Sequence, residues 1–184
     1  MFWDNPGPEN TQATLEIACR EAVARNIRHL VVASNEGNTI RQLLADFDVD
    51  NLNIVCVTHH VGFCGPGVDE MSAEVREELA SKGVKLLTTT HLLAGIDRGL
   101  RYEFGGLYPP EIIANTLRMF GQGVKVCVEV SMMALDAGLV PYGEDVIAVA
   151  GKSRGADTAC VVRPAHSTAV FETKVKEILC RPRL

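Results

Sequence analysis

Short uninterrupted apolar runs alternate along the chain with segments in which apolar residues recur every three or four positions. Runs rich in Val, Ile and Leu are typical of strands buried on both faces of a sheet. Five segments have this pattern: His29–Ser34, Asn53–Thr58, Val84–Thr88, Asp145–Ala150 and Asp157–Pro164. The tail, about Val175 to Leu179, is compatible with one more short edge strand.

The segments between these runs have helical spacing. Helices are predicted over Thr11 to about Arg25, Thr39–Phe47, Val68 or Asp69 to Lys82, Pro109 to about Gly121, and Val124–Ala137. Thr11 is the predicted cap of the first helix, and the glycine-rich residues 89–106 are expected to form an irregular connection with some helix. Alternation of strands and helices predicts a three-layer α/β/α sandwich with parallel strands. No linker or repeat interrupts residues 1–184, so a single domain is expected.

Composition and charge exclude several classes of protein. Apolar residues make up 47% of the 184 residues and charged residues 22%, as in ordinary globular domains. The net charge of −5 argues against a nucleic-acid partner. No apolar run is long enough to span a membrane, and the first residues lack the features of a signal peptide. Six cysteines without a CxxC pair, several of them inside strand-like runs, favour a reduced cytoplasmic protein over a disulfide framework.

Loops that follow parallel strands are the expected ligand sites, because ligands bind beyond the carboxyl ends of such strands. The segment Ser34-Asn35-Glu36-Gly37-Asn38-Thr39 joins a predicted strand to a helix N-terminus. Its hydroxyls, amides and glycine, with the free N–H groups of the helix, suit a phosphate. It is not a Walker A loop, and a simple turn capped by Asn38 or Thr39 is the alternative.

A second candidate loop is Gly151-Lys152-Ser153-Arg154-Gly155-Ala156-Asp157. Lys152 and Arg154 between two glycines can approach an anion, and Asp157 can accept hydrogen bonds from ligand hydroxyls or a ring N–H. The alternative is a tight connection between neighbouring strands that carries two solvated cations.

The loop after the second strand begins Thr58-His59-His60-Val61-Gly62. Its histidines and Cys64 lack the spacing of a zinc site, so no metal is expected. Adjacent histidines on an extended segment point in opposite directions, so at most one of the two readily faces the cleft at the strand ends. The apolar stripe within Val124–Leu135 is interpreted as core packing and not as a cofactor site.

Three segments together resemble a known family. Residues Ile27–Thr39 and Leu52–Thr58 resemble the C-terminal domain of pyruvate kinase, with its strand, phosphate loop, helix and strand. Residues 6–11, 58–63 and 150–159 are similar to hallmarks of small stand-alone proteins related to that domain. The resemblance covers nearly the whole chain, and the motif at 150–159 is the most specific part of it.

The resemblance implies a mixed five-stranded sheet of order 3-2-1-4-5 with the last strand antiparallel. It also implies that flavin mononucleotide (FMN) is the cofactor, held where the two candidate loops meet, and it makes a homo-oligomer plausible. The implied binding residues are Ser34, Asn35, Gly37, Asn38, Thr39, Thr58, His59, Gly62, Gly151, Lys152, Arg154, Gly155, Ala156 and Asp157. The catalytic barrel of pyruvate kinase has no counterpart in these residues, so phosphoryl transfer is not implied.

The main hypothesis is therefore a cytoplasmic protein that binds a phosphorylated small molecule, FMN above all. Two alternatives stay open. One is a flavin- or phosphosugar-dependent enzyme that uses His59 or His60 and Asp157 in acid–base roles. The other is a regulatory module that binds a partner protein. No residue set in the chain has the spacing of a known catalytic constellation.

Overall fold

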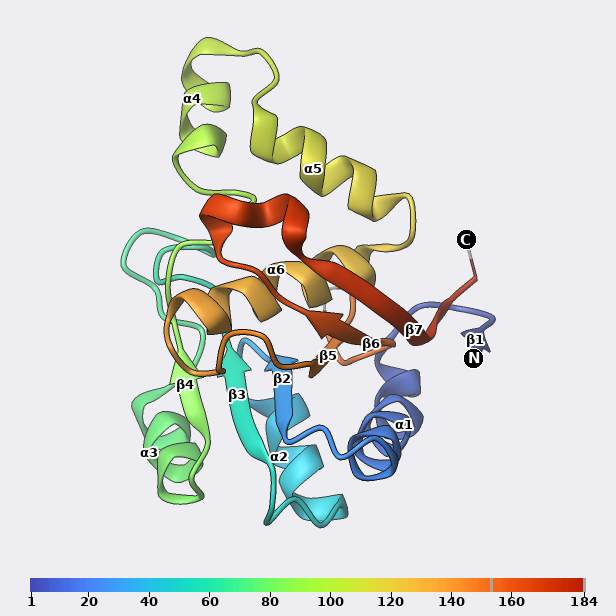
Figure 1. Cartoon of the computed structure of the whole chain (residues 1–184). Coiled ribbons are helices and arrows are strands. Elements are labelled where there is room, and N and C mark those ends of the chain that lie inside the picture. The colour runs from blue at the N-terminus through green and yellow to red at the C-terminus, as the bar shows by residue number, and fades with distance from the viewer. Residues whose placement is uncertain (153, 184) are drawn as a thin grey trace.

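Strands and helices alternate along the computed structural model, which describes residues 1–152 and 154–183 (Figure 1). Ser153, in the second candidate loop, lies outside the described residues. The strands are β1 (Phe2–Trp3), β2 (His29–Ala33), β3 (Asn53–Val57), β4 (Lys85–Leu87), β5 (Val146–Ala150), β6 (Thr158–Arg163) and β7 (Lys174–Pro182). The α-helices are α1 (Thr11–Ala24), α2 (Asn38–Asp46), α3 (Ala73–Ser81), α4 (Ile96–Phe104), α5 (Pro109–Arg118) and α6 (Gln122–Asp136). Two 3-10 helices are η1 (Pro8–Asn10) and η2 (Ser167–Glu172).

The described strands form a mixed sheet of seven strands in the order β1-β7-β6-β5-β2-β3-β4. Strand β2 pairs in parallel with both β3 and β5, and β3 pairs in parallel with β4. Strand β6 is antiparallel to β5. The sheet has seven strands and not the five that the resemblance implies, because β7, indicated from the sequence only as a short tail strand, and β1 extend it. Strand β1 has only two residues, too few to show any hydrophobic period.

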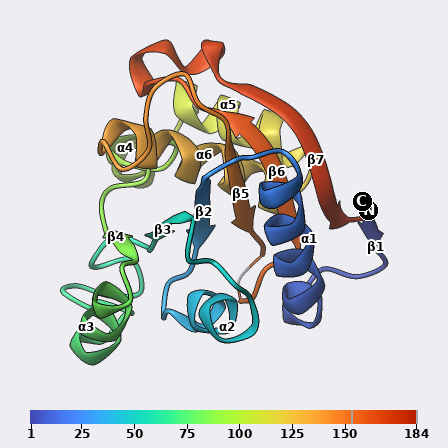
Figure 2. The ribbon, with the colours of Figure 1, turned by 60° about the horizontal axis from the view of Figure 1, so that its bottom comes forward.

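The two chain ends meet at this added edge of the sheet (Figures 1 and 2). Strand β1 pairs in parallel with β7. The Met1 ammonium group donates a hydrogen bond to the Leu179 carbonyl at 2.6 Å. The Trp3 indole N–H donates to the Asp157 carbonyl at 2.7 Å. The first residues are therefore tied to the loop between β5 and β6.

Helices cover both faces of the sheet because successive strand residues point to opposite sides. Leu30 and Val32 of β2 belong to the core beneath α1, α2 and α3, whereas Val31 belongs to the core beneath α6. All three side chains are fully buried. Helix α5 contacts α6 on the side of α6 away from the sheet (Figure 1).

One predicted helix start and one predicted helix cap are wrong. Helix α3 begins at Ala73 and not near Val68, because the Ser72 hydroxyl caps it by accepting from the Val75 N–H at 3.4 Å. Thr11 does not cap α1, since Asn10 occupies the N-cap position. The Thr11 hydroxyl accepts instead from the Ala156 N–H at 2.9 Å. The Thr11 hydroxyl therefore bonds to a residue far away in the sequence and not to the first turn of its own helix.

Helix α6 approaches β6 closely at a glycine. A Cβ atom added to Gly123 would lie 2.0 Å from the Thr158 hydroxyl oxygen and 2.4 Å from the Thr158 Cβ. Only glycine allows the first turn of α6 to rest on β6 at this distance. Gly123 thus sets the position of the helix whose next residues line the cavity described below.

We expect Gly123→Ala to destabilise the protein by about 1–3 kcal/mol, the usual cost of overpacking a core. The matched control is Gly99→Ala in α4, where no heavy atom lies within 4 Å of an added Cβ. That change should be neutral or stabilise by up to about 1 kcal/mol, because alanine favours helix. Denaturant unfolding measures both. Equal unfolding midpoints for the two variants would contradict the close contact between Gly123 and Thr158.

Candidate functional site

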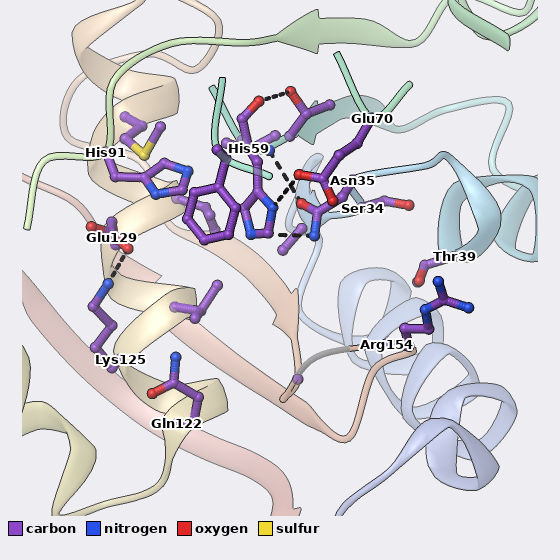
Figure 3. Close-up of a pocket in the computed structure, with 18 of the residues that line it drawn as sticks. Ser34, Asn35, Thr39, His59, Glu70, His91, Gln122, Lys125, Glu129 and Arg154 are labelled. Atoms are coloured by element: carbon purple, nitrogen blue, oxygen red, sulfur yellow. Dashed lines mark hydrogen bonds and ion pairs between the residues drawn. The ribbon is translucent and has the colours of Figure 1, made fainter. Parts of the chain in front are cut away.

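A cavity of about 490 Å³ opens at the edge of the sheet where β2, β3 and β5 end (Figure 3). We call it the strand-end cavity. Ser34, Thr58 and Gly151, each directly after a strand, contribute to its lining. The start of α2 lies on one side and α6 on the other. Its position agrees with the rule that ligands of parallel sheets bind beyond the carboxyl ends of the strands.

Nine of the fourteen predicted binding residues line this cavity: Ser34, Asn35, Asn38, Thr39, Thr58, His59, Gly151, Arg154 and Gly155. They come from three loops that are distant in sequence. The structure therefore brings the two predicted candidate loops and the loop after β3 to one place. The other five, Gly37, Gly62, Lys152, Ala156 and Asp157, are not among the lining residues.

The N-terminus of α2 forms one end of the strand-end cavity. Gly37 is the N-cap, with φ of +88°, and no side chain of the described residues caps the helix. The predicted cap, Asn38 or Thr39, is thus wrong. Ser34 and Thr39, two buried residues that carry hydroxyls, line the cavity at this end. First-turn N–H groups and these hydroxyls remain available to an anion.

Two predicted glycines shape loops without lining the cavity. Gly37 is buried against α3, where an added Cβ would lie 2.6 Å from the Val75 Cγ1. Gly62 has φ of +91°, and its N–H donates to the Val68 carbonyl at 2.8 Å. Each residue is needed for backbone conformation, which favours glycine in the left-handed region.

Asp157 faces the N-terminal segment of the chain. Its side chain is buried, with 2% of the residue exposed, and accepts from the Thr158 hydroxyl at 2.8 Å. Burial, the largest effect, raises the pKa of Asp157, and the nearby backbone N–H groups of Gly7 and Lys152 act in the opposite direction. The preceding Ala156 donates to Thr11. These contacts turn the end of the loop toward η1 and α1, and the sequence pattern gave no sign of them.

His59 has a defined tautomer. The backbone N–H of His59 donates to the Asn35 Oδ1 at 3.1 Å, which fixes the orientation of the Asn35 amide. The Asn35 Nδ2 therefore donates to the His59 Nε2, 3.3 Å away. His59 Nδ1 carries the proton and donates to the Glu70 Oε2 at 2.6 Å. A neutral imidazole with its accepting nitrogen at the cavity is the result (Figure 3).

Aromatic rings form a wall beside this histidine. The Phe63 ring stacks on the His59 ring with centroids 3.7 Å apart, and the His91 ring lies 5.4 Å from that of His59. The Arg98 guanidinium lies 5.8 Å from the centre of the Phe63 ring. Among the described residues, no three His, Cys, Asp or Glu side chains gather as a metal site would require.

Helix α6, whose apolar stripe is predicted to pack in the core, also contributes residues to the lining of the cavity. Val126, Val130 and Met133 supply apolar surface, and Lys125 and Glu129 form an ion pair (Figure 3). Burial, the largest effect, lowers the pKa of Lys125, although Glu129 opposes this. In the sequence, the signal that could have indicated this pair is two charged residues four positions apart in an otherwise apolar helix. Glu70, Arg98 and Arg118 also line the cavity and had no signal in the sequence.

These features define an α/β domain with a ligand-sized cavity at the carboxyl ends of its parallel strands. Residues 12–162 match the family model described as "Pyruvate kinase, alpha/beta domain". The match covers more than half of the chain, so the chain belongs to this family.

Solved structures with similarity to the chain include pyruvate kinases of Cryptosporidium parvum. One is 18% identical, with a TM-score of 0.39 over 77% of this chain and 20% of the enzyme. Another, in complex with ADP, is 20% identical, with a TM-score of 0.45 over 84% of this chain and 24% of the enzyme. The chain thus spans about a fifth to a quarter of the length of these enzymes. Separately, none of the helices in the described residues is both long and apolar enough to cross a membrane.

The His91 side chain generates a prediction about pH. Burial is the largest cause that lowers its pKa below the ordinary value of 6.5, and the positive charge of Lys125 acts in the same direction. Glu129 opposes the shift. The unfolded chain therefore binds a proton at this residue more readily than the folded protein. His91 should cost stability as the pH falls through and below 6.5.

We expect His91→Asn to lose less free energy of unfolding than the parent when the pH is lowered from about 7.5 to about 5.5, because asparagine does not titrate. Urea unfolding at the two pH values measures the difference. An identical pH dependence in parent and variant would show that His91 titrates alike in both states.

Proposed function

We propose that this protein binds a phosphorylated small molecule in the strand-end cavity, with its phosphate at the N-terminus of α2. The observation that carries the proposal is the start of α2, which has no side-chain cap among the described residues and shares the cavity with Ser34 and Thr39. A helix N-terminus with free N–H groups and a partial positive charge favours a phosphate. The cavity volume is within the usual range for small-molecule sites.

Charges at this end of the cavity are balanced. Glu36 would repel a phosphate, but the exposed Arg154 lies 3.4 Å from its carboxylate and crosses from the loop after β5. The Asn38 amide also donates to Glu36, at 3.2 Å. Arg154 therefore neutralises the carboxylate and can turn to a phosphate, which is a stronger partner for a guanidinium.

The favoured ligand is FMN. The lining of the rest of the cavity includes Phe63, His91, Val126, Val130 and Met133, aromatic and apolar groups that suit a planar ring. The choice of FMN over other phosphorylated ring compounds rests on the family resemblance noted from the sequence. We place the protein in the cytoplasm, because all six cysteines are free and five of them are buried.

An enzyme is the second candidate, and the His59–Glu70 pair favours it. A neutral imidazole oriented by a carboxylate is a general base in many enzymes. Here the accepting Nε2 would have to exchange the Asn35 amide for a substrate proton. Turnover of phosphorylated sugars by the parent and its loss in His59→Asn would support this candidate, whereas no turnover by either leaves ligand binding alone.

Ligand binding is tested first by visible absorbance. We expect FMN to bind and to change its visible absorbance on addition of the protein. Riboflavin, which lacks the phosphate, should bind about a hundredfold or more weakly, because charge-assisted hydrogen bonds contribute about 1.5–3 kcal/mol each. Absorbance and fluorescence titrations measure both affinities. Equal affinity for FMN and riboflavin would contradict the placement of the phosphate at the N-terminus of α2.

The phosphate end is tested by hydroxyl deletions. We expect the double change Ser34→Ala and Thr39→Val to weaken FMN binding by at least about tenfold, through lost hydrogen bonds to the phosphate. Riboflavin affinity should not change. The matched control is Thr116→Val, which removes a hydroxyl that donates to the Ile112 carbonyl on α5, outside the cavity lining. FMN binding that survives the double change unaltered would contradict the placement.

A further inference from the structure

A buried ion pair stands at the other end of the strand-end cavity. In the close-up, Lys125 and Glu129 lie on the opposite side from Thr39 and Arg154 (Figure 3). Each residue has only 4% of its surface exposed, and both line the cavity. Burying two charges in a helix is costly, and apolar residues in their place are often no less stable. Such a pair therefore calls for a functional reason.

Glu129 is held from two directions. Its Oε1 accepts the backbone N–H of Leu93 at 2.8 Å, from the segment between β4 and α4. Its Oε2 accepts from the Lys125 Nζ. Both carboxylate oxygens are thus in use, and the ammonium group is fixed by a carboxylate that cannot turn away. Glu129 acts as a positioning residue for Lys125.

The Lys125 ammonium group has N–H donors that the hydrogen bond to Glu129 does not use. An ammonium group has three N–H donors. Within the described residues, the Lys125 Nζ donates only to Glu129. Because the side chain lines the cavity and is otherwise buried, the remaining N–H groups can be satisfied only from the cavity. Their natural partner is an oxygen acceptor.

Neighbouring charges favour an electron-rich oxygen. Arg98 and Arg118 line the same part of the cavity and add positive charge. The Arg118 guanidinium donates to the neutral side chains of Gln122 and Asn115, both at 2.8 Å. His91, on the facing segment, has a lowered pKa. At this end of the cavity the negative charge of Glu129 is outnumbered by the positive charges of Lys125, Arg98 and Arg118.

We propose that Lys125, positioned by Glu129, donates hydrogen bonds to a carbonyl oxygen on the ring of the bound ligand, at the end remote from its phosphate. This inference rests on the proposed function and narrows its ligand class to phosphorylated compounds whose planar ring carries a carbonyl group. In FMN the oxygens of the pyrimidine ring meet this requirement. In this proposal the cavity binds two groups of the ligand, a phosphate at α2 and a ring oxygen at α6.

The experiment compares FMN and riboflavin binding in the parent, Lys125→Met and Lys125→Arg. We expect Lys125→Met to weaken FMN by at least about tenfold, and riboflavin by the same factor, because the lost contact is to the ring. Lys125→Arg keeps a cationic donor and should lose less. The matched control is Lys82→Met, which removes the lysine of another i,i+4 pair, with Glu78 at 2.9 Å, on the half-exposed end of α3. It should bind FMN like the parent.

Each outcome has one meaning. Lys125→Met that binds FMN as tightly as the parent overturns the inference and leaves the proposed function standing. Loss of FMN affinity without loss of riboflavin affinity also overturns it, since Lys125 would then contact the phosphate. A parent that binds no FMN is a failure of the proposed function itself.

A second variant guards against misfolding of Lys125→Met. Glu129→Gln keeps an acceptor for the Leu93 N–H but sets an amide NH₂ against the ammonium group, so Lys125 must move. We expect it too to weaken FMN and riboflavin by equal factors, with the unfolding midpoint recorded alongside. Parent-like affinity in a folded Glu129→Gln variant overturns the role of Glu129 in positioning Lys125.

Discussion

The parallel pairing of β2 with both β3 and β5 is the constraint on which the site depends. Strands that run in the same direction end at the same edge, so the segments after β2, β3 and β5 must meet there. Helix α2 leaves β2 toward one face, whereas α6 enters β5 from the other face (Figures 1 and 2). The start of α2 and the start of α6 are thereby separated by the sheet edge, and the cavity lies between them.

The two ends of the cavity differ in chemistry for reasons of burial. At α2, the groups available to a ligand are backbone N–H groups and hydroxyls, with the exposed pair of Arg154 and Glu36 at the rim. At α6, the group available to a ligand belongs to the buried ion pair of Lys125 and Glu129. An exposed pair is screened by water and contributes little, whereas buried charges act strongly on whatever fills the space beside them. A ligand that is charged at one end and flat at the other complements this division.

The N-terminal residues support the site without lining it. Pro8 and Thr11 lie so close to Gly155 that a Cβ there would come within 2.5 Å of the Pro8 Cα. Trp3 donates to the Asp157 carbonyl, and Thr11 accepts from the Ala156 N–H. These contacts hold the end of the loop after β5, and Gly151, Arg154 and Gly155 of the same loop line the cavity. The same contacts explain why Asp157 is buried away from it.

Sequence alone determined the strands β2 to β6, the helices that flank them and the loops that carry most of the cavity lining, because hydrophobic period and glycine placement are local properties. It also indicated the tail strand, but as a shorter one than the nine-residue β7. Tertiary structure alone decided which groups face the cavity. Asp157 looked accessible in its loop, yet contacts from the other end of the chain bury it. Lys125 and Glu129 looked like part of a core helix, and only the gap between α6 and α2 makes them cavity residues. Such placements depend on contacts between distant segments, which no local pattern records.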